Sequence, residues 1–332
     1  MKKRGELWTL ASLALAGLLI AGCSDNQVEP GDGDAAPLGV TTEEQAIEYY
    51  AVNDEFVANE EETFTDREVT AADAGSFGKI DAAVTPIRFG RMITGITKTV
   101  ETTFEPGDEF AIAHITKDIT GVFKILAVTA ENETLIVDKP FNDKSERNVV
   151  FTRVARDPRR FWRNWVPVST SLVKGGTVPP NDLVQITKLE LITPESTIVI
   201  VDPLTHYMYY GWMGMHRMRE ALKQGDVPQF VGGQEVTVRV TLTSPKADPD
   251  FVAIRYGYMG LHWKRFPMEL KQETPDGGMW TRVYETRGTR PVYMHFHRGW
   301  FNLGIDAVTH ETLYDDEAPY SASWWGIPYR VF

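Results

Sequence analysis

The stretch EVTVRVTLT, residues 235–243, decides the fold of the second half of the chain. Its valines and leucine alternate with threonine and arginine, and successive side chains of a strand point to opposite faces. The alternation therefore predicts a strand in a sheet with one buried face. Other short β-rich runs accompany it at residues 189–191, 197–201, 251–258, 263–270, 279–285, 292–297 and 303–309.

Short strands separated by turns such as PDGG, residues 275–278, resemble the pattern of an immunoglobulin-like β-sandwich. The paired cysteines of antibody domains are absent, so the resemblance is one of pattern alone. One amphipathic helix is expected among the strands, because Met215, Met218 and Leu222 form an apolar stripe that ends at Gly225. We expect a mainly β protein whose C-terminal part is an antiparallel sandwich with one inserted helix.

The first half is predicted to form a small α+β or mostly β domain. Thr42 and Gln45 form a capping-box pattern, which predicts a helix directly after them. Five β-rich runs lie between residues 94 and 154, with turns expected at Pro106-Gly107, Glu131-Asn132 and Asn142-Asp143. The segment KGGTVPPND, residues 174–182, contains two glycines and two prolines and predicts a linker between two domains.

The chain's single cysteine, Cys23, ends the run LIAGC at residues 19–23. Lys2, Lys3 and Arg4 precede an apolar stretch at residues 8–20, which is too short to span a bilayer. These residues resemble the signal of bacterial lipoproteins. The resemblance implies cleavage before Cys23, a diacylglycerol on its sulfur and an acyl chain (palmitate) on its new amino group, which together anchor a protein stably. With Ser24 next, it also implies the outer membrane in a bacterium that has two membranes.

The sequence thus divides into a signal peptide at 1–22, a flexible tether at 23–40, an N-terminal α+β or β domain at 41–173, a linker at 174–182 and a β-sandwich domain at 183–332. The tether is rich in Asp, Gly and Pro and has almost nothing to bury. Acidic residues gather at positions 24–73, and the remaining mature chain is neutral. A neutral body outside the cytoplasm argues against nucleic acid as a partner.

Histidines suggest one possible metal site. His295 and His297 stand two apart on an expected strand and so share a face, as in a two-histidine metal site. His310 could join them only if its strand end is adjacent. The favoured alternative is a polar outer face of a strand whose Met294 and Phe296 point inward. We therefore expect no cofactor, with a transition metal as the alternative.

Asp315, Asp316 and Glu317 form a run of three carboxylates that could hold Ca²⁺ or divide acid and base roles in a hydrolase. The run lacks the alternate spacing of a Ca²⁺ loop, which favours a solvated or salt-bridged loop. The sequence contains no glycine-rich phosphate loop, nucleophile elbow or zinc-protease helix. A non-enzymatic protein is expected, and a carboxylate-based hydrolase is an alternative.

Aromatic and arginine residues give the better indication of binding. Both side chains of the pair Trp324-Trp325 cannot point to one face of an extended segment, so we expect one of them on a surface or at an interface. Arginines beside tryptophans before residue 174 could bind an anionic glycan or lipid headgroup, or could stack within an interface. The candidate binding residues are Trp324, Trp325, Arg159, Arg160, Trp162 and Trp165.

These features favour a membrane-anchored extracytoplasmic module that binds an envelope partner or a glycan. This hypothesis predicts an exposed aromatic patch. An alternative is a surface assembly subunit of the pilus type, in which WWGIPYRVF, residues 324–332, is donated as a strand to a neighbouring subunit.

Overall fold

The structure is a computed structural model that describes residues 40–53, 69–70, 84–107, 109–130, 132–157, 159–209, 225–258, 261–286, 292–293 and 299–332. The described residues belong to one compact unit, Gly39–Phe332. The signal sequence with Cys23, the tether up to residue 39 and the expected helix at residues 215–222 lie outside the described residues.

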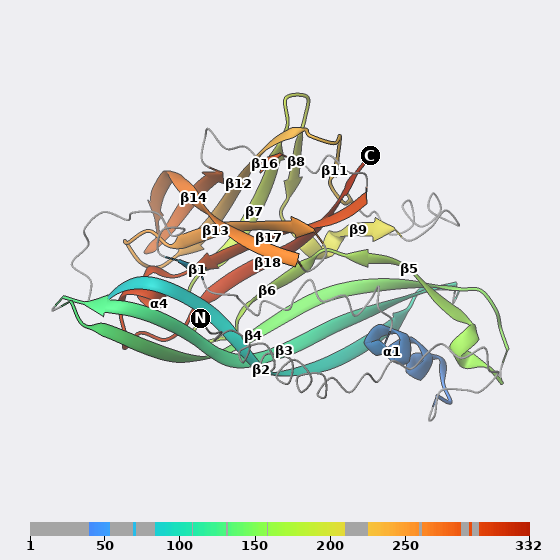
Figure 1. The fold of residues 1–332 in the computed structure, drawn as a ribbon. Coiled ribbons are helices and arrows are strands. Elements are labelled where there is room, and N and C mark those ends of the chain that lie inside the picture. Colours follow the sequence, from blue (N-terminus) through green and yellow to red (C-terminus); the bar gives the residue numbers. More distant parts are fainter. Residues whose placement is uncertain are drawn as a thin grey trace, which may run out of the picture. The chain divides into compact units, whose positions relative to one another are not determined.

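The fold is mainly β, as the sequence predicts (Figure 1). The first nine strands are β1 (Val69–Thr70), β2 (Val84–Phe104), β3 (Phe110–Thr129), β4 (Thr134–Arg153), β5 (Trp165–Ser171), β6 (Val173–Thr177), β7 (Gln185–Ile192), β8 (Thr197–Ile200) and β9 (His206–Tyr209). The others are β10 (Gly225–Asp226), β11 (Gln229–Phe230), β12 (Glu235–Ser244), β13 (Phe251–Tyr258), β14 (Leu261–Asp276), β15 (Met279–Thr286), β16 (Val292–Tyr293), β17 (Gly299–Val308) and β18 (Ala322–Val331). The helices are α1 (Glu43–Asn53) and α4 (His310–Tyr314), with short 3₁₀ turns at Phe161–Arg163 and Pro203–Thr205.

The five β-rich runs of the first half form three long strands. β2, β3 and β4 run antiparallel and side by side over nearly their full lengths (Figure 1). Two of the expected turns are confirmed, since Gly107 and Asn132 adopt positive φ angles of 94° and 67° between the strands. The prediction of a turn at Asn142-Asp143 is wrong, because both residues continue β4. Thr177 Oγ1 donates to the buried Asp143 carboxylate, so a tertiary contact overrides the local turn preference.

α1 packs against β2 and β3 at one end of this three-stranded sheet. The predicted capping box is present, because the Gln45 amide donates to Thr42 Oγ1 and the Thr42 amide donates to Gln45 Oε1, each at 3.2 Å. Ile47 and Ala51 of the helix lie in a buried cluster with Phe151 and Trp165. The helix therefore covers an apolar end of the sheet.

The second half is an antiparallel sandwich, as predicted. One layer has the order β8-β7-β12-β15-β14, and the facing layer has the order β14-β13-β17-β18. β14 belongs to both layers, because its first part pairs with β13 and its later part pairs with β15. The alternating Val236, Val238, Val240 and Leu242 fill the core between the layers. The predicted hairpin turn is confirmed, with Gly277 at a φ of 57°.

Most of the sandwich layer that contains β17 and β18 is buried on both faces, except near Trp300 and Arg330. Its second face packs against β2–β4, where Phe89 of β2 meets Phe251 of β13 at a ring-centroid distance of 5.2 Å. Phe123 of β3 and Phe141 of β4 both contact Tyr320, with centroids 5.1 Å away. A shared apolar cluster thus joins residues from both sides of the expected linker, and the division into two domains stays a prediction.

Part of the expected linker is a strand. Residues 174–177 belong to β6, which pairs with β4 on one side and β18 on the other. A Cβ atom on Gly175 would lie 2.2 Å from the Trp324 ring. Glycine is required here because that ring presses against the strand. The glycines therefore mark a close packing contact rather than a break in the sheet.

Candidate binding surface

The neighbouring strands β11, β18 and β17 share a face that is exposed to solvent near the C-terminal end of β18. In the register of the sheet, Arg330 of β18 lies opposite Trp300 of β17 on one side and Gln229 of β11 on the other. Val231 and Phe332 each lie two residues farther along, and alternate residues of a strand share a face. The Phe332 amide donates to the Phe230 carbonyl at 3.1 Å, which keeps the chain ends together. We call these five residues the platform: Gln229, Val231, Trp300, Arg330 and Phe332.

The platform side chains are accessible to solvent. Trp300 is 42% exposed, and Val231 and Phe332 are each 53% exposed. Gln229 and Arg330 are exposed as well. The Arg330 guanidinium lies 5.7 Å from the centre of the Trp300 ring, so a cation–π contact orients both groups.

The opposite face of the same strands is the sandwich core. Phe230, Phe301, Tyr329 and Val331 alternate with the platform residues and are buried in the cluster between the layers. The platform therefore stands on a rigid support whose side chains are fixed by packing.

The expectation that Trp324 or Trp325 lies on a surface is wrong. Each side chain is 1% exposed. They do point in opposite directions, but Trp325 enters the sandwich core and Trp324 enters the cluster shared with β2–β4. The expectation failed because it assumed a sheet with one solvated face.

The arginine and tryptophan group before residue 174 is partly an internal stack. Trp165 is fully buried, and the Arg153 guanidinium lies 4.5 Å from the centre of its ring. Arg153 also forms an ion pair with Glu43 of α1. Arg159 is exposed and Arg160 half-buried beside the turn that contains Trp162. Stacking within the protein thus accounts for Trp165, and Arg159 and Arg160 stay candidates.

The predicted metal candidates are not brought together in the described part of the chain. His295 and His297 lie outside the described residues. No group of three or more His, Cys, Asp or Glu residues suited to a metal occurs in the ranges that the structure describes. His310 stacks on Tyr314 at a centroid distance of 4.4 Å, and burial lowers its pKa. Stacking and burial favour a structural, neutral imidazole at this position.

The carboxylate run forms a structured loop. Asp315 Oδ1 accepts hydrogen bonds from the backbone amides of Glu317 at 2.9 Å and Ala318 at 3.2 Å. Lys139 Nζ donates to the backbone carbonyls of Glu311, Asp315 and Ala318. Asp316 and Glu317 are both exposed beside it. This arrangement resembles the solvated, braced loop that the spacing favours.

A buried charged network lies between β2–β4 and the sandwich. The fully buried Asp306 carboxylate accepts hydrogen bonds from Arg91, Arg255 and Arg265, each at 2.8 Å. Burial acts to raise the pKa of Asp306, but Arg91 and Arg265 outweigh it and hold the pKa below its ordinary value. Arg91 also contacts Tyr320, whose hydroxyl donates to Asp143.

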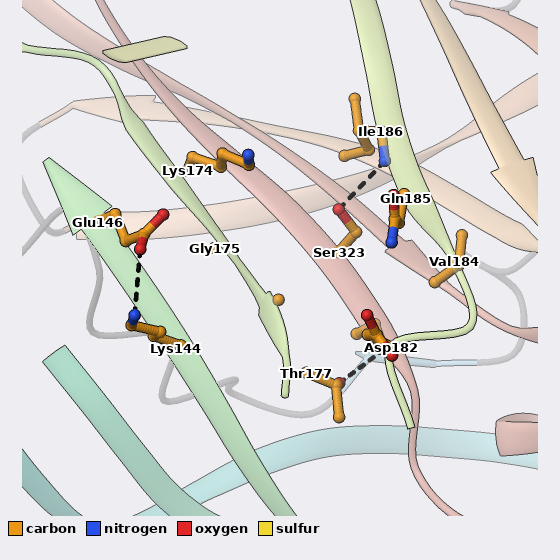
Figure 2. A pocket seen from close by; sticks show the side chains of 12 residues that line it. Lys144, Glu146, Lys174, Gly175, Thr177, Asp182, Val184, Gln185, Ile186 and Ser323 are labelled. Atoms are coloured by element: carbon orange, nitrogen blue, oxygen red, sulfur yellow. Dashed lines mark hydrogen bonds and ion pairs between the residues drawn. The ribbon is translucent and has the colours of Figure 1, made fainter. Parts of the chain in front are cut away.

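Thr177, which donates to Asp143, also lines a groove. The groove has a volume of about 230 Å³. It lies between β4, β6, β18 and the segment that leads into β7 (Figure 2). Its lining residues are Lys144, Glu146, Lys174, Gly175, Gly176, Thr177, Asp182, Val184, Gln185, Ile186, Ala322 and Ser323.

Sequence reasoning missed both the platform and the groove. Trp300 stands out only as one of nine tryptophans, and its neighbours Gln229 and Arg330 are brought to it by long-range strand pairing. The groove joins segments that are far apart along the chain. The two glycines at 175 and 176 were its one local signal, and they were interpreted as a linker.

Comparisons with known proteins assign no family. No family model and no curated protein matches the chain. Among solved structures, the chain is similar to the SMP domain and two C2 domains of extended synaptotagmin 2, with 13% sequence identity and a TM-score of 0.13. The match covers 86% of this chain, which spans 62% of that structure. A likeness at this level carries no conclusion about fold or function.

Within the described ranges, no helix has the length and apolar character needed to cross a bilayer.

Proposed function

We propose that the protein is a lipid-anchored, extracytoplasmic, non-enzymatic binding module that recognises an envelope glycan through the platform. The observation that carries this proposal is the exposed Trp300 ring, held beside Arg330 and Gln229 on a rigid sheet. Sugar rings stack on exposed tryptophan faces, and guanidinium and amide groups hydrogen-bond to hydroxyls. Phe332 and Val231 extend the apolar surface for a second sugar unit.

The other candidate functions gain no comparable observation. Residues 324–331 of the proposed donor segment pair within their own chain, with β17 on one side and with β6 and β11 on the other. Of the carboxylates proposed for a hydrolase, Asp315 accepts hydrogen bonds from two backbone amides. An envelope protein is the other occupant of the platform to consider, because tryptophan and arginine also dominate protein interfaces.

The glycan proposal is tested by binding of the full chain, purified in detergent, to an array of bacterial envelope glycans. Trp300→Ala should abolish binding while leaving the thermal midpoint unchanged, since the side chain lies on the surface. Trp280→Ala is the matched control, because Trp280 is also stacked on an arginine, Arg282, at 5.5 Å. Equal glycan binding by Trp300→Ala and wild type would contradict the proposal. If the wild type captures an envelope protein and Trp300→Ala does not, the ligand of the platform is that protein and not a glycan.

The lipid anchor is tested separately through Cys23. Cys23→Ala should move the protein from the membrane to the soluble fraction, because no lipidated residue would remain. Intact-mass measurement of the wild type should show loss of residues 1–22 and addition of a diacylglycerol and an acyl chain. Ser24→Ala is the control and should stay in the membrane. An unmodified Cys23 in the mature protein would contradict the anchor.

A further inference from the structure

The groove between β4, β6, β18 and β7 carries a second inference, which does not depend on the platform. We propose that this groove binds a short peptide with a free amino group and a free carboxylate. Three features of the groove favour such a ligand: its walls, its charges and its size.

The groove is held open by the fold. The Ile186 amide donates to Ser323 Oγ at 3.2 Å, and the Leu183 amide donates to Ser321 Oγ at 3.0 Å. These bonds fix the segment leading into β7 at a set distance from β18. Gly175 and Gly176 cannot take a side chain, because a Cβ would meet the Trp324 ring or the Ala322 carbonyl. The Trp324 ring and the Ala322 carbonyl fill this space, so β6 and β18 pack tightly together along the groove.

The groove presents free charges of both signs. Lys144 and Glu146 form an ion pair with each other at 3.2 Å on one wall (Figure 2). In contrast, the Lys174 ammonium, the Asp182 carboxylate and the Gln185 amide make no hydrogen bond or ion pair with any side chain in the part of the chain that the structure describes. Figure 2 shows Lys174 and Asp182 at opposite ends of the groove.

A ligand with opposite charges at its two ends matches this arrangement. Its carboxylate would accept hydrogen bonds from Lys174, its ammonium group would donate to Asp182, and Gln185 could bond to a peptide group between them. The groove's volume of about 230 Å³ has room for several water molecules or for a small organic ligand. A dipeptide is of this size. A neutral sugar would leave both charges without a partner, so the groove favours the peptide.

The test measures binding of L-alanyl-L-alanine to the full chain in detergent by saturation-transfer NMR and calorimetry. We expect a dissociation constant of about 1 mM or lower. The same peptide with acetylated and amidated ends has a similar size but no charge, and it should not bind. Lys174→Met and Asp182→Asn should each raise the dissociation constant about tenfold, as expected for loss of a charge-assisted hydrogen bond.

Lys124→Met is the matched control, because Lys124 is an exposed lysine paired with Asp138 outside the groove. It should leave the dissociation constant unchanged. Absence of binding, equal binding of the blocked peptide, or unchanged binding by both groove variants would overturn the proposal. Trp300→Ala should retain peptide binding, so a failure of the glycan proposal and a failure of this one can be told apart.

Discussion

Asp306 gathers three guanidinium groups at a fully buried site. Arg91 comes from β2, Arg255 from β13 and Arg265 from β14, so one carboxylate ties the long-stranded sheet to the sandwich. Replacing such a network with apolar residues can be neutral, but removing one partner leaves buried charges uncompensated. The geometry of the arginines therefore depends on Asp306.

We predict that Asp306→Asn lowers the free energy of unfolding by about 3–5 kcal/mol, because three arginines lose their shared counter-charge. Urea denaturation at neutral pH measures the change. Asp138→Asn is the control, since Asp138 is half-exposed and pairs with an exposed lysine, and its effect should stay below about 1 kcal/mol. Similar losses for the two variants would show that the buried cluster contributes no more than a surface pair.

Lys139 gives the fold a defined pH dependence. Burial lowers its pKa to about 8, although Asp315 and Asp316 act to raise it. Its ordinary value is 10.5. Between these two values, the unfolded chain holds more protons at this site than the native chain does. The contribution of Lys139 to the free energy of unfolding therefore rises with pH in this window.

We predict that the difference in unfolding free energy between wild type and Lys139→Met grows from pH 7.5 to pH 10. The variant lacks the Lys139 ammonium and keeps all other titrating groups. The difference between the two proteins therefore isolates the contribution of Lys139. At pH 7.5 the variant should already be less stable, by about 1–3 kcal/mol, because carbonyls bonded by Lys139 lose a donor. A difference that stays constant or shrinks with pH would contradict the assigned pKa.

At the scale of elements, α1 is the case in which sequence and structure agree most closely. The capping box at Thr42 and Gln45 is a local motif, and its hydrogen bonds do not depend on distant residues. We predict that Thr42→Ala lowers stability by about 0.5–2 kcal/mol. Chemical denaturation measures this loss, with the exposed Glu48→Ala as a control of little effect. An unchanged midpoint for Thr42→Ala would mean that packing alone holds the helix.

Strands were predicted well where their pattern is local and poorly where it depends on partners. The alternation in residues 235–243 correctly predicts β12, since one of its faces is buried and the other is not. The Trp324-Trp325 segment has no such alternation because residues 322–329 of β18 are buried on both faces. Asn142-Asp143 carries a turn signal that is overruled by Thr177 and Tyr320. The sequence alone does not encode these partners in any short window.

The candidate sites were harder to predict than the strands for the same reason. We expect an exposed tryptophan at position 324 or 325, whereas the structure exposes Trp300. Trp300 and Arg330 stand 30 positions apart and meet only through the β17–β18 register. Register is set by long-range pairing and core alternation, which a single sequence does not reveal.

At the scale of the whole molecule, the shared cluster makes a prediction about cooperativity. Phe89 and Phe123 lie before the expected linker, whereas Phe251 and Trp324 lie after it, and all are buried together. We predict that the body unfolds in one calorimetric transition, with equal van't Hoff and calorimetric enthalpies. Two resolved transitions would instead support two domains that fold independently at 41–173 and 183–332.

The position of β18 has a consequence for the order in which the protein can fold. β18 leaves the ribosome after every other described strand, yet it pairs with β6 and β17 in the interior of the sheet. During synthesis, the centre of the sheet lacks this strand until residues 322–331 have emerged, so the packing around Trp324 and Trp325 forms last. Late arrival of a central strand keeps the preceding chain from completing its tertiary structure. A protein that must be threaded across a membrane before it folds would benefit from this delay.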